Sequence, residues 1–409
     1  MNVLFIGGSD FGRIYNHRGH HFVAFLESYF DRVDIVCLRK FYSGSASAGA
    51  WTRFRCGLRD ILGNRVEVIK RRKGIQVDIR KLPGRLDPIA QDLWAYLNLG
   101  SLSGQRYELC IFGNPDNVLL PLFLRKKGVV GALIYDDWDY YPGFPRSALW
   151  KCLMKWREQI SVSIADVVIS VGSLLADLRR SQGAARTLVI PNGVDYHLFA
   201  SAQEKRTHPP TLVYLGTLAD EYGIDISIEG FAKVRNEVPS ARYLIIGLEK
   251  GEYGRYLRKL VDDLKLGDRV LFLGHKEYNE LPHFLAEADI GVALFRPSDL
   301  MKYAFPLKVV EYMAAGLAVV GTKIGETGKL ILEGKSGMAV ECSSGEFASA
   351  VINMLNDKVS LSKYCENAKE YARRYDWDLL FAGLLDVVKN ETSMGVPLGH
   401  SIPNHVKIE

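Results

Sequence analysis

The segment from Asp289 to Gly321 constrains the fold of this chain more than any other. Its apolar runs at Asp289–Phe295 and Leu317–Gly321 each predict a buried strand. Between them the sequence predicts a short helix, with Pro306 at its first position and Gly316 just past its end. Strand, helix and strand in this order form one βαβ unit of a parallel sheet. Ligands of such sheets bind beyond the carboxyl ends of the strands, where helix N-termini also point.

Lys308 lies in the first turn of this predicted helix. A cation there opposes the helix macrodipole, at a cost of about 0.3–1 kcal/mol, and a bound anion would remove the conflict. Glu311 follows three residues later, on the same helical face, where its carboxylate could accept hydrogen bonds from ribose or sugar hydroxyls. The alternative is an ordinary surface pair of lysine and glutamate.

Length and composition are those of a soluble globular protein with two domains. The chain has 409 residues, of which 48% are hydrophobic and 24% charged. No run approaches the eighteen or so apolar residues that a membrane span needs. The start, Met1–Gly8, predicts a first strand and its turn rather than a signal peptide, so we expect a cytoplasmic protein.

Neither a metal nor a cofactor is expected. The six cysteines are scattered without a Cys-x-x-Cys motif. Three histidines fall within His17–His21, but no carboxylate or cysteine is spaced with them as in metal sites. The glycine-rich turn at Gly7–Gly12 departs from the dinucleotide fingerprint, because Ser9 occupies the second glycine position, and this disfavours an NAD oxidoreductase.

The excess of positive charge lies in the first half of the chain. The alternatives for such a cluster are a solvated face, an anionic lipid surface or a nucleic acid. Aromatic residues interleaved with cations, at Trp51 and Phe54 and again at Trp150 and Trp156, suit an interfacial helix better than a base-stacking platform. We therefore expect peripheral contact with an anionic membrane, at its inner face, and no nucleic acid. The cations of the cluster are Arg53, Arg55, Arg59, Lys70–Lys73, Arg80, Lys81 and Arg85.

Three carboxylates, Asp136, Asp137 and Asp139, end a predicted strand of the first half. Crowding should raise the pKa of one of them and make it a usable base. An alternative is that they cap the next helix. Asp137-x-Asp139 also resembles the metal-binding pattern of GT-A glycosyltransferases, a rival that implies one nucleotide-binding domain and a divalent metal.

The run from Pro306 to Gly316, Pro-x-Lys-x-x-Glu-Tyr-Met-Ala-Ala-Gly, resembles the donor-site helix of retaining GT-B glycosyltransferases of the large fourth family, the glycosyl transferases group 1 type. Val189–Asp195, with its Pro-Asn-Gly-Val-Asp turn, resembles the interdomain joint of the same family. The resemblance covers nearly the whole chain and is most specific from Val189 to Val340. It implies an α/β fold with two Rossmann-like, doubly wound parallel-sheet domains facing a central cleft.

The domain boundaries expected from this resemblance are an acceptor-side domain over 1–190, a linker over 191–210, a nucleotide-sugar donor domain over 211–365, a helix crossing back over 366–390, and a disordered tail over 391–409.

The resemblance also implies roles for individual residues. The enzyme would move a sugar from a nucleotide sugar to a hydroxyl of a glycan or lipid-linked glycan, with retention and without metal. Glu311 would hold the ribose and Lys308 the phosphates. Asp136 or Asp137 would orient or deprotonate the acceptor. The donor pocket would further include Gly216, Thr217, Pro306, Gly325, Glu326 and Thr327, and the acceptor side Gly8, Arg18 and Asp139.

Two departures from the family pattern bear on activity. Tyr303 stands where the family often has a first glutamate. Gly216-Thr217 and Tyr222-Gly223 lack the arginine and lysine that usually neutralise the diphosphate. A leaving nucleoside diphosphate needs charge stabilisation. The remaining candidates for it are Lys308 and the helix N-terminus, followed by Arg296 and Lys323. The rival hypotheses are a noncatalytic relative that binds a sugar or lipid carrier, and metal-dependent transfer at Asp137 and Asp139.

Overall fold

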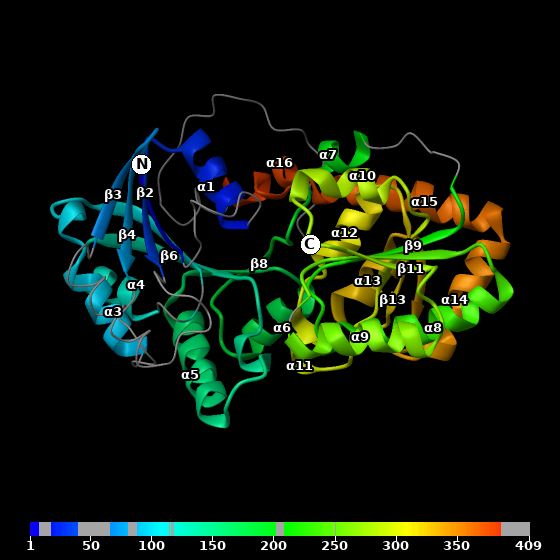
Figure 1. The fold of residues 1–409 in the computed structure, drawn as a ribbon. Helices are drawn as coiled ribbons and strands as arrows, with labels where there is room; N and C mark the ends of the chain where they lie inside the picture. The colour runs from blue at the N-terminus through cyan, green and yellow to red at the C-terminus, as the bar shows by residue number, and fades with distance from the viewer. Residues whose placement is uncertain are drawn as a thin grey trace. The chain divides into compact units, whose positions relative to one another are not determined.

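The structure of the chain is a computed structural model. It describes residues 1–7, 18–39, 66–80, 88–113, 115, 118–201, 208–249 and 251–385. The chain forms two compact units. The first contains the residues up to Ile190 and those from Phe381 onward, and the second contains Pro191–Leu380. Each unit is built on its own β-sheet (Figure 1).

In the described residues, the sheet of the first unit has eight strands in the order β3-β4-β2-β1-β5-β6-β7-β8. Neighbouring strands pair in parallel, except that β3 and β4 form an antiparallel edge. The central strands are runs of buried apolar residues, as expected where both faces of a parallel sheet are covered. The strands are β1 (Asn2–Gly7), β2 (Arg32–Arg39), β3 (Val66–Arg71), β4 (Gly74–Arg80), β5 (Tyr107–Gly113), β6 (Val130–Asp137), β7 (Val167–Ser170) and β8 (Thr187–Val189).

Alternate residues of β1 show how the first sheet is covered. Leu4 and Ile6 join an apolar core with the helices α3 and α4, whereas Phe5 points the other way and meets Phe22 of α1 edge-on. Phe381, where the chain returns to this unit, stacks on Phe22 at 4.8 Å between ring centroids. The helices are α1 (Arg18–Tyr29), α3 (Pro88–Leu97), α4 (Leu119–Lys126), α5 (Ala148–Ile164) and α6 (Ser173–Ser181), with 3₁₀ turns η1 (Gly100–Leu102) and η3 (Tyr141–Gly143).

The sheet of the second unit runs β11-β10-β9-β12-β13-β14, and all the described pairs are parallel. This is the strand order of a doubly wound dinucleotide-binding sheet, in which chain direction across the sheet reverses between β9 and β12. Ligands of such sheets bind at this switch point, beyond the carboxyl ends of the strands. The strands are β9 (Thr211–Leu215), β10 (Arg242–Ile246), β11 (Val270–Gly274), β12 (Ile290–Ala293), β13 (Ala318–Thr322) and β14 (Gly337–Val340).

The helix predicted after Pro306 is α12 (Leu307–Ala314). Pro306 is the N-cap of this helix, whereas the sequence analysis placed it at the first helical position. Gly316 has φ +73° and closes the helix as predicted, because its N–H bonds to Met313 and that of Leu317 to Tyr312, the pattern of a Schellman motif. The other helices of this unit are α7 (Tyr196–Ser201), α8 (Ile224–Glu237), α9 (Gly251–Asp263), α10 (Leu281–Leu285), α11 (Asp299–Tyr303), α13 (Gly325–Glu333), α14 (Ser344–Asn356), α15 (Lys358–Ala372) and α16 (Trp377–Leu380), with 3₁₀ turns η4 (Asp220–Tyr222), η5 (Tyr278–Glu280) and η6 (Arg373–Tyr375).

The segment expected as a linker, residues 191–210, contains regular structure. Residues 196–201 form α7, and the Val194 N–H bonds to the Tyr375 carbonyl at 2.8 Å. The helix expected over 366–390 is also divided, because α15 ends at Ala372 and Asp376 separates η6 from α16. The expected disordered tail, 391–409, lies outside the described residues. None of the described helices combines the length and apolar character needed to cross a bilayer.

The Pro-Asn-Gly turn packs so closely that its glycine should be indispensable for stability. A Cβ atom at Gly193 would lie 2.6 Å from the Trp377 ring and 2.8 Å from the Tyr375 carbonyl oxygen. We expect Gly193→Ala to lower the free energy of unfolding by about 1–3 kcal/mol, the usual cost of overpacking. Urea denaturation measures this loss. Gly267→Ala is the control, because nothing lies within 4 Å of its Cβ position; equal stability of the two variants would contradict the packing argument.

Candidate functional site

The switch point of the second sheet is fixed by a tyrosine that sequence analysis did not single out. The Tyr312 hydroxyl of α12 accepts the Leu215 N–H of β9 at 2.7 Å and lies 3.3 Å from the Val292 carbonyl oxygen of β12. Its ring lies over Gly291, where a Cβ atom would be 2.3 Å from the ring carbons. One side chain thus ties α12 to both strands that flank the switch point. The sequence held one signal for this contact: Gly291, a glycine inside a predicted strand, which often marks the close approach of another group.

Lys308 reaches from the first turn of α12 into a cage of aromatic rings. Its Nζ lies 4.2 Å from the ring centroid of Tyr214, 4.5 Å from that of Tyr222 and 5.3 Å from that of Phe295. It also lies 3.1 Å from where a Cβ atom at Gly216 would stand. Cation–π attraction holds the ammonium there. The sequence predicted the lysine but not the cage.

Burial lowers the pKa of Lys308 to about 7, although Glu311 acts to raise it. Burial likewise raises the pKa of Glu311, whose exposed fraction is 7%, to about 7, with Lys308 acting to lower it. Within the described part of the chain, neither side chain makes a hydrogen bond or a close ion pair. Buried charged groups are normally paired, because desolvation without compensation is costly. This pair therefore has the character of a site prepared for a polar ligand.

The predicted donor residues Gly325, Glu326 and Thr327 form the start of α13. Gly325 has φ +51°, and a Cβ atom there would lie 2.3 Å from the Lys302 carbonyl oxygen, so only glycine fits. Glu326 and Thr327 follow and are buried. Ile324, at the N-cap, gives no side-chain hydrogen bond to the helix, so the first backbone N–H groups of α13 depend on other partners.

Two other predicted donor residues line the end of β9. Thr217 is partly exposed, and its carbonyl accepts the Tyr214 hydroxyl at 2.8 Å. Gly216 has φ +128°, which favours glycine. The structure therefore brings Gly216 and Lys308 together.

Arg296 and Lys323, considered as further cations for a diphosphate, already have acidic partners. Arg296 pairs with Asp220 at 3.2 Å and with Asp225 at 2.5 Å. Lys323 lies 3.7 Å from Glu341. Lys308 is therefore the cation of the three that forms no ion pair with a described residue.

In the first unit, the carboxylates at the end of β6 are engaged by arginines. Arg18 of α1 holds Asp136 with Nη2–Oδ1 at 2.8 Å and Nε–Oδ1 at 3.0 Å, and both side chains are buried. Arg179 of α6 holds Asp137 with Nε–Oδ2 at 2.7 Å and Nη2–Oδ1 at 3.0 Å. This burial and pairing favour a structural role for Asp136 and Asp137 over the catalytic role that the sequence suggested.

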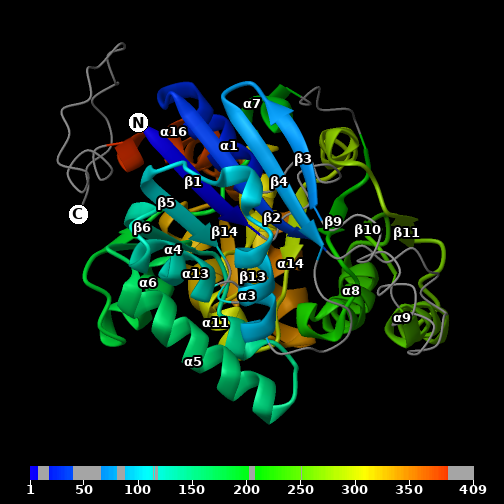
Figure 2. The ribbon, with the colours of Figure 1, turned by 90° about the vertical axis from the view of Figure 1, so that its left-hand side faces the viewer.

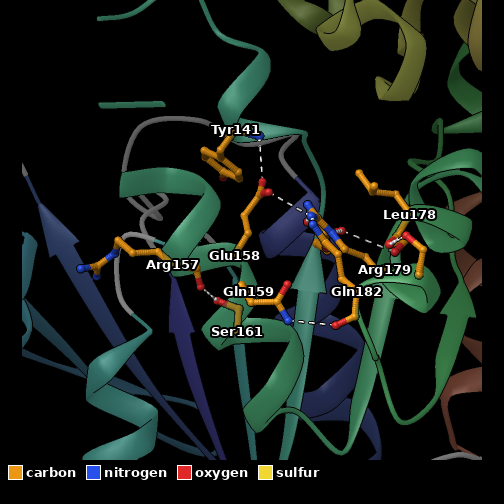
Figure 3. Close-up of polar contacts among 11 residues, drawn as sticks. Tyr141, Arg157, Glu158, Gln159, Ser161, Leu178, Arg179 and Gln182 are labelled. Carbon is orange, nitrogen blue, oxygen red and sulfur yellow. Dashed lines mark hydrogen bonds and ion pairs between the residues drawn. The ribbon is translucent and has the colours of Figure 1, made fainter. Parts of the chain in front are cut away.

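Glu158 of α5 completes the network around Arg179 (Figure 3). It accepts from Arg179 Nη1 at 2.9 Å and from the Tyr141 N–H at 3.1 Å. It thereby links α5, α6 and the turn after β6. Burial raises the pKa of Glu158 to about 7, although Arg179 acts to lower it, and the nearby Asp137 carboxylate adds to the rise. Sequence analysis missed this network, since its members lie far apart along the chain.

Asp139 is the carboxylate of this loop that stays partly exposed. Burial and the nearby Asp137 raise its pKa to about 7, so it can exchange a proton near neutral pH. Both oxygens of Asp137 accept from Arg179, which argues against a metal held by Asp137 and Asp139. No cluster of three metal-ligating side chains occurs in the described residues. Gly8, expected on the acceptor side, lies outside them.

Comparison with known proteins agrees with this geometry. Residues 198–375 match the family model described as "Glycosyl transferases group 1". The second unit is a glycosyl transferases group 1 domain. The matched segment contains the switch point, the Lys308 cage, Glu311 and the start of α13.

The curated relatives support the assignment of this domain. The chain is 28% identical over 212 residues to the phosphatidyl-myo-inositol mannosyltransferase of Mycolicibacterium smegmatis, covering 51% of this chain and 53% of that protein. It is 30% identical over 231 residues to the glycogen synthase of Mycobacterium tuberculosis, covering 54% of this chain and 52% of that one. The chain thus spans about half the length of the curated relatives it matches.

Solved structures share the fold over nearly the whole chain. Sucrose-phosphate synthase from Thermosynechococcus elongatus aligns with a TM-score of 0.73 at 19% identity, covering 96% of this chain and 99% of that one. Anabaena HepE in complex with UDP aligns with a TM-score of 0.69 at 18% identity, covering 95% and 100%. At such identities these likenesses establish the fold. They confirm the predicted GT-B class of two α/β units with largely parallel sheets.

Replacing the caged lysine of the group 1 domain should stabilise it. An unfolded Lys308 stays protonated to a pKa of about 10.5, whereas the folded site lowers this pKa to about 7. The folded state therefore carries a penalty that is full below pH 7 and disappears toward pH 10. We expect Lys308→Met to raise the free energy of unfolding at pH 7 by about 1–3 kcal/mol, allowing for solvent screening.

Urea denaturation at pH 7, 8 and 9 would test this, with the gain shrinking as the pH rises. Lys302→Met is the control, because Lys302 is exposed and its loss should change stability by less than about 0.5 kcal/mol. A lower free energy of unfolding for Lys308→Met at pH 7 would show that burying this lysine carries no such penalty.

Proposed function

We propose that this chain is a glycosyltransferase that moves a hexosyl group from a nucleotide sugar to a hydroxyl of a glycan or lipid-linked glycan. The observation that carries the proposal is the caged Lys308 beside the buried Glu311, at the start of a helix and at the switch point of a doubly wound sheet. The family match, the names of the relatives and the UDP complexes of HepE support it.

Transfer breaks the bond between the anomeric carbon and the diphosphate, so negative charge grows on the leaving group. Lys308 is the donor that stabilises this charge, and the N-terminus of α13, from Gly325 to Thr327, adds backbone N–H groups. Glu311 accepts hydrogen bonds from the ribose. The loop at Gly216 and Thr217 has no bulky side chain at Gly216, which leaves room for the ammonium.

A bound diphosphate would also restore the charge of the lysine. Opposite charges within a few ångströms raise the pKa of a cation, so Lys308, half-protonated near pH 7, takes up a proton as the donor binds. Donor affinity should therefore weaken as the pH rises above 7. The charge is thus generated where the leaving group needs it.

On the acceptor side, we assign the proton-accepting or orienting role to Asp139. Its carboxylate is partly exposed and titrates near neutral pH, while Asp136 and Asp137 hold the end of β6 through their arginines. Retention of configuration and independence of metal remain part of the proposal. So does a cytoplasmic location at the inner face of a membrane; the names of two relatives, which include phosphatidylinositol lipids, support contact with a lipid.

A noncatalytic relative that binds a sugar or lipid carrier is the second candidate. The observation in its favour is that Tyr303, Thr217 and Tyr222 stand where the family usually has a glutamate, an arginine and a lysine. Release of a nucleoside diphosphate by the purified chain, from any nucleotide sugar, would exclude it.

Removing the ammonium should abolish most of the turnover. We expect Lys308→Met to lower turnover by about 10²–10³, the scale of losing one charge-stabilising donor. The measurement is the release of nucleoside diphosphate from a nucleotide sugar. The substrate is the nucleotide sugar that raises the melting temperature of the wild-type chain most. Lys302→Met should keep the wild-type rate. Full activity of Lys308→Met would show that the phosphates are held elsewhere.

Removing the Glu311 carboxylate should act on binding. We expect Glu311→Ala to weaken nucleoside diphosphate binding by about tenfold, because a charged hydrogen bond to the ribose is lost. Titration with UDP, GDP and ADP by thermal shift would measure this and identify the base as well. Glu366→Ala, an exposed glutamate of α15, serves as the control. Unchanged affinity in the Glu311 variant would remove its assigned role.

A further inference from the structure

The first half of α5 carries large apolar side chains into solvent. Leu149 is 81% exposed and Trp156 46% exposed, and Cys152 between them is exposed too. Positions 149, 152 and 156 are three and seven residues apart, so they form one stripe along the helix. Single exposed apolar residues are ordinary, but a stripe containing leucine and tryptophan on one helix usually marks an interaction surface.

The same half of the helix is positively charged. From Pro145 to Arg157 the sequence has no aspartate or glutamate. Arg146 and Lys155 are exposed and Lys151 partly so, and none of the three forms an ion pair within the described residues. The outer side of residues 146–156 therefore combines three unneutralised cations with the apolar stripe.

The next two charged residues of α5 do not contribute to this exposed surface, because both are buried and paired inside the first unit. Arg157 is buried and pairs with Asp92 at 2.7 Å. Glu158 is buried against Arg179, as described above. Because the inner face is fixed by buried groups, the stripe sits on a firmly packed helix rather than on a frayed end.

The position of α5 leaves this stripe accessible. The helix runs along the lower border of the first unit in both views (Figure 1, Figure 2). Ser147 caps its start by accepting the Trp150 N–H at 3.4 Å. The helix is therefore formed from its first turn, where Leu149 and Lys151 lie.

We propose that residues 146–156, the α5 docking surface, bind the anionic surface of a lipid bilayer. Leu149 and Trp156 would enter the headgroup region, where tryptophan is favoured, while Arg146, Lys151 and Lys155 lie against anionic headgroups. Apolar insertion or charge alone gives marginal membrane binding, and the two together give stable, reversible binding.

Charge decides between this occupant and a second copy of the chain. Two copies meeting through this surface would bring three cations against three, and like charges facing each other oppose association. An anionic bilayer complements the cations and also accepts the apolar stripe. The inference is independent of the proposed reaction, because it uses no residue of the donor site.

Flotation of the full chain with lipid vesicles tests the proposal. We expect the protein to float with phosphatidylcholine vesicles containing about 30% phosphatidylglycerol, to stay unbound with pure phosphatidylcholine, and to be released by about 0.5 M salt. Lys151→Gln with Lys155→Gln should lower the partition coefficient about 30-fold, at about fivefold per cation. Leu149→Ser with Trp156→Ser should lower it about tenfold or more.

The matched control is Val359→Ser with Lys363→Gln on α15, which removes one exposed apolar residue and one exposed cation from another helix. It should float like the wild-type chain. Circular dichroism and the thermal shift with UDP should be unchanged in all three variants, which separates a docking defect from misfolding and from failure of the donor site.

Three results would overturn the proposal. The wild-type chain could remain unbound with the anionic vesicles, or both α5 variants could float as it does. Finally, light scattering without vesicles could show that Leu149→Ser with Trp156→Ser converts a dimer to a monomer, which would assign the surface to contacts between copies.

Discussion

The hydrogen bonds of the Tyr312 hydroxyl are the interaction on which the site of the second unit depends. They join the helix that carries Lys308 and Glu311 to β9 and to β12, the strands on either side of the switch point. Gly291 is required for this, since any side chain there would displace the ring. With α12 fixed at this place, Lys308 in its first turn extends toward the end of β9, where its Nζ lies beside Gly216. The buried contact between Tyr312 and Gly291 thus helps to determine the position of Lys308.

Charged groups in the first unit and at the start of α12 follow opposite patterns. In the first unit, Arg157 pairs with Asp92, and Arg179 with Asp137 and Glu158, so the buried ions have partners and their hydrogen bonds tie helices to loops. In the second unit, Glu311 is buried and Lys308 is half-buried, and within the described residues neither side chain makes such bonds. Fully paired buried ions specify structure, whereas incompletely paired ones store free energy that a ligand can recover. The contrast distinguishes the paired carboxylates of the first unit from Glu311, the carboxylate proposed to bind the donor.

Much of the second unit was predictable from the sequence, because its signals are local. The apolar runs around α12, the closing role of Gly316 and the conflict of Lys308 with the helix dipole all lie within a few residues of one another. The aromatic cage was not predictable, because Tyr214, Tyr222 and Phe295 come from different elements and meet only when the sheet forms. In the first unit the sequence located the acidic strand end but could not identify its partners. Asp137 and Arg179 are 42 residues apart, and no periodicity records their pairing.

The composition of the cage fits the proposal that Lys308 serves where the family usually has two other cations. Desolvation alone would drive Lys308 neutral, and a carboxylate partner would hold its charge but cancel it. Aromatic rings attract the ammonium through their negative faces, and they carry no net charge that would cancel the charge of the lysine. The acids of the neighbouring loop, Asp220 and Asp225, are meanwhile occupied by Arg296, which keeps them from competing for the lysine. The site thus retains a cation whose charge is poised to respond to an arriving anion.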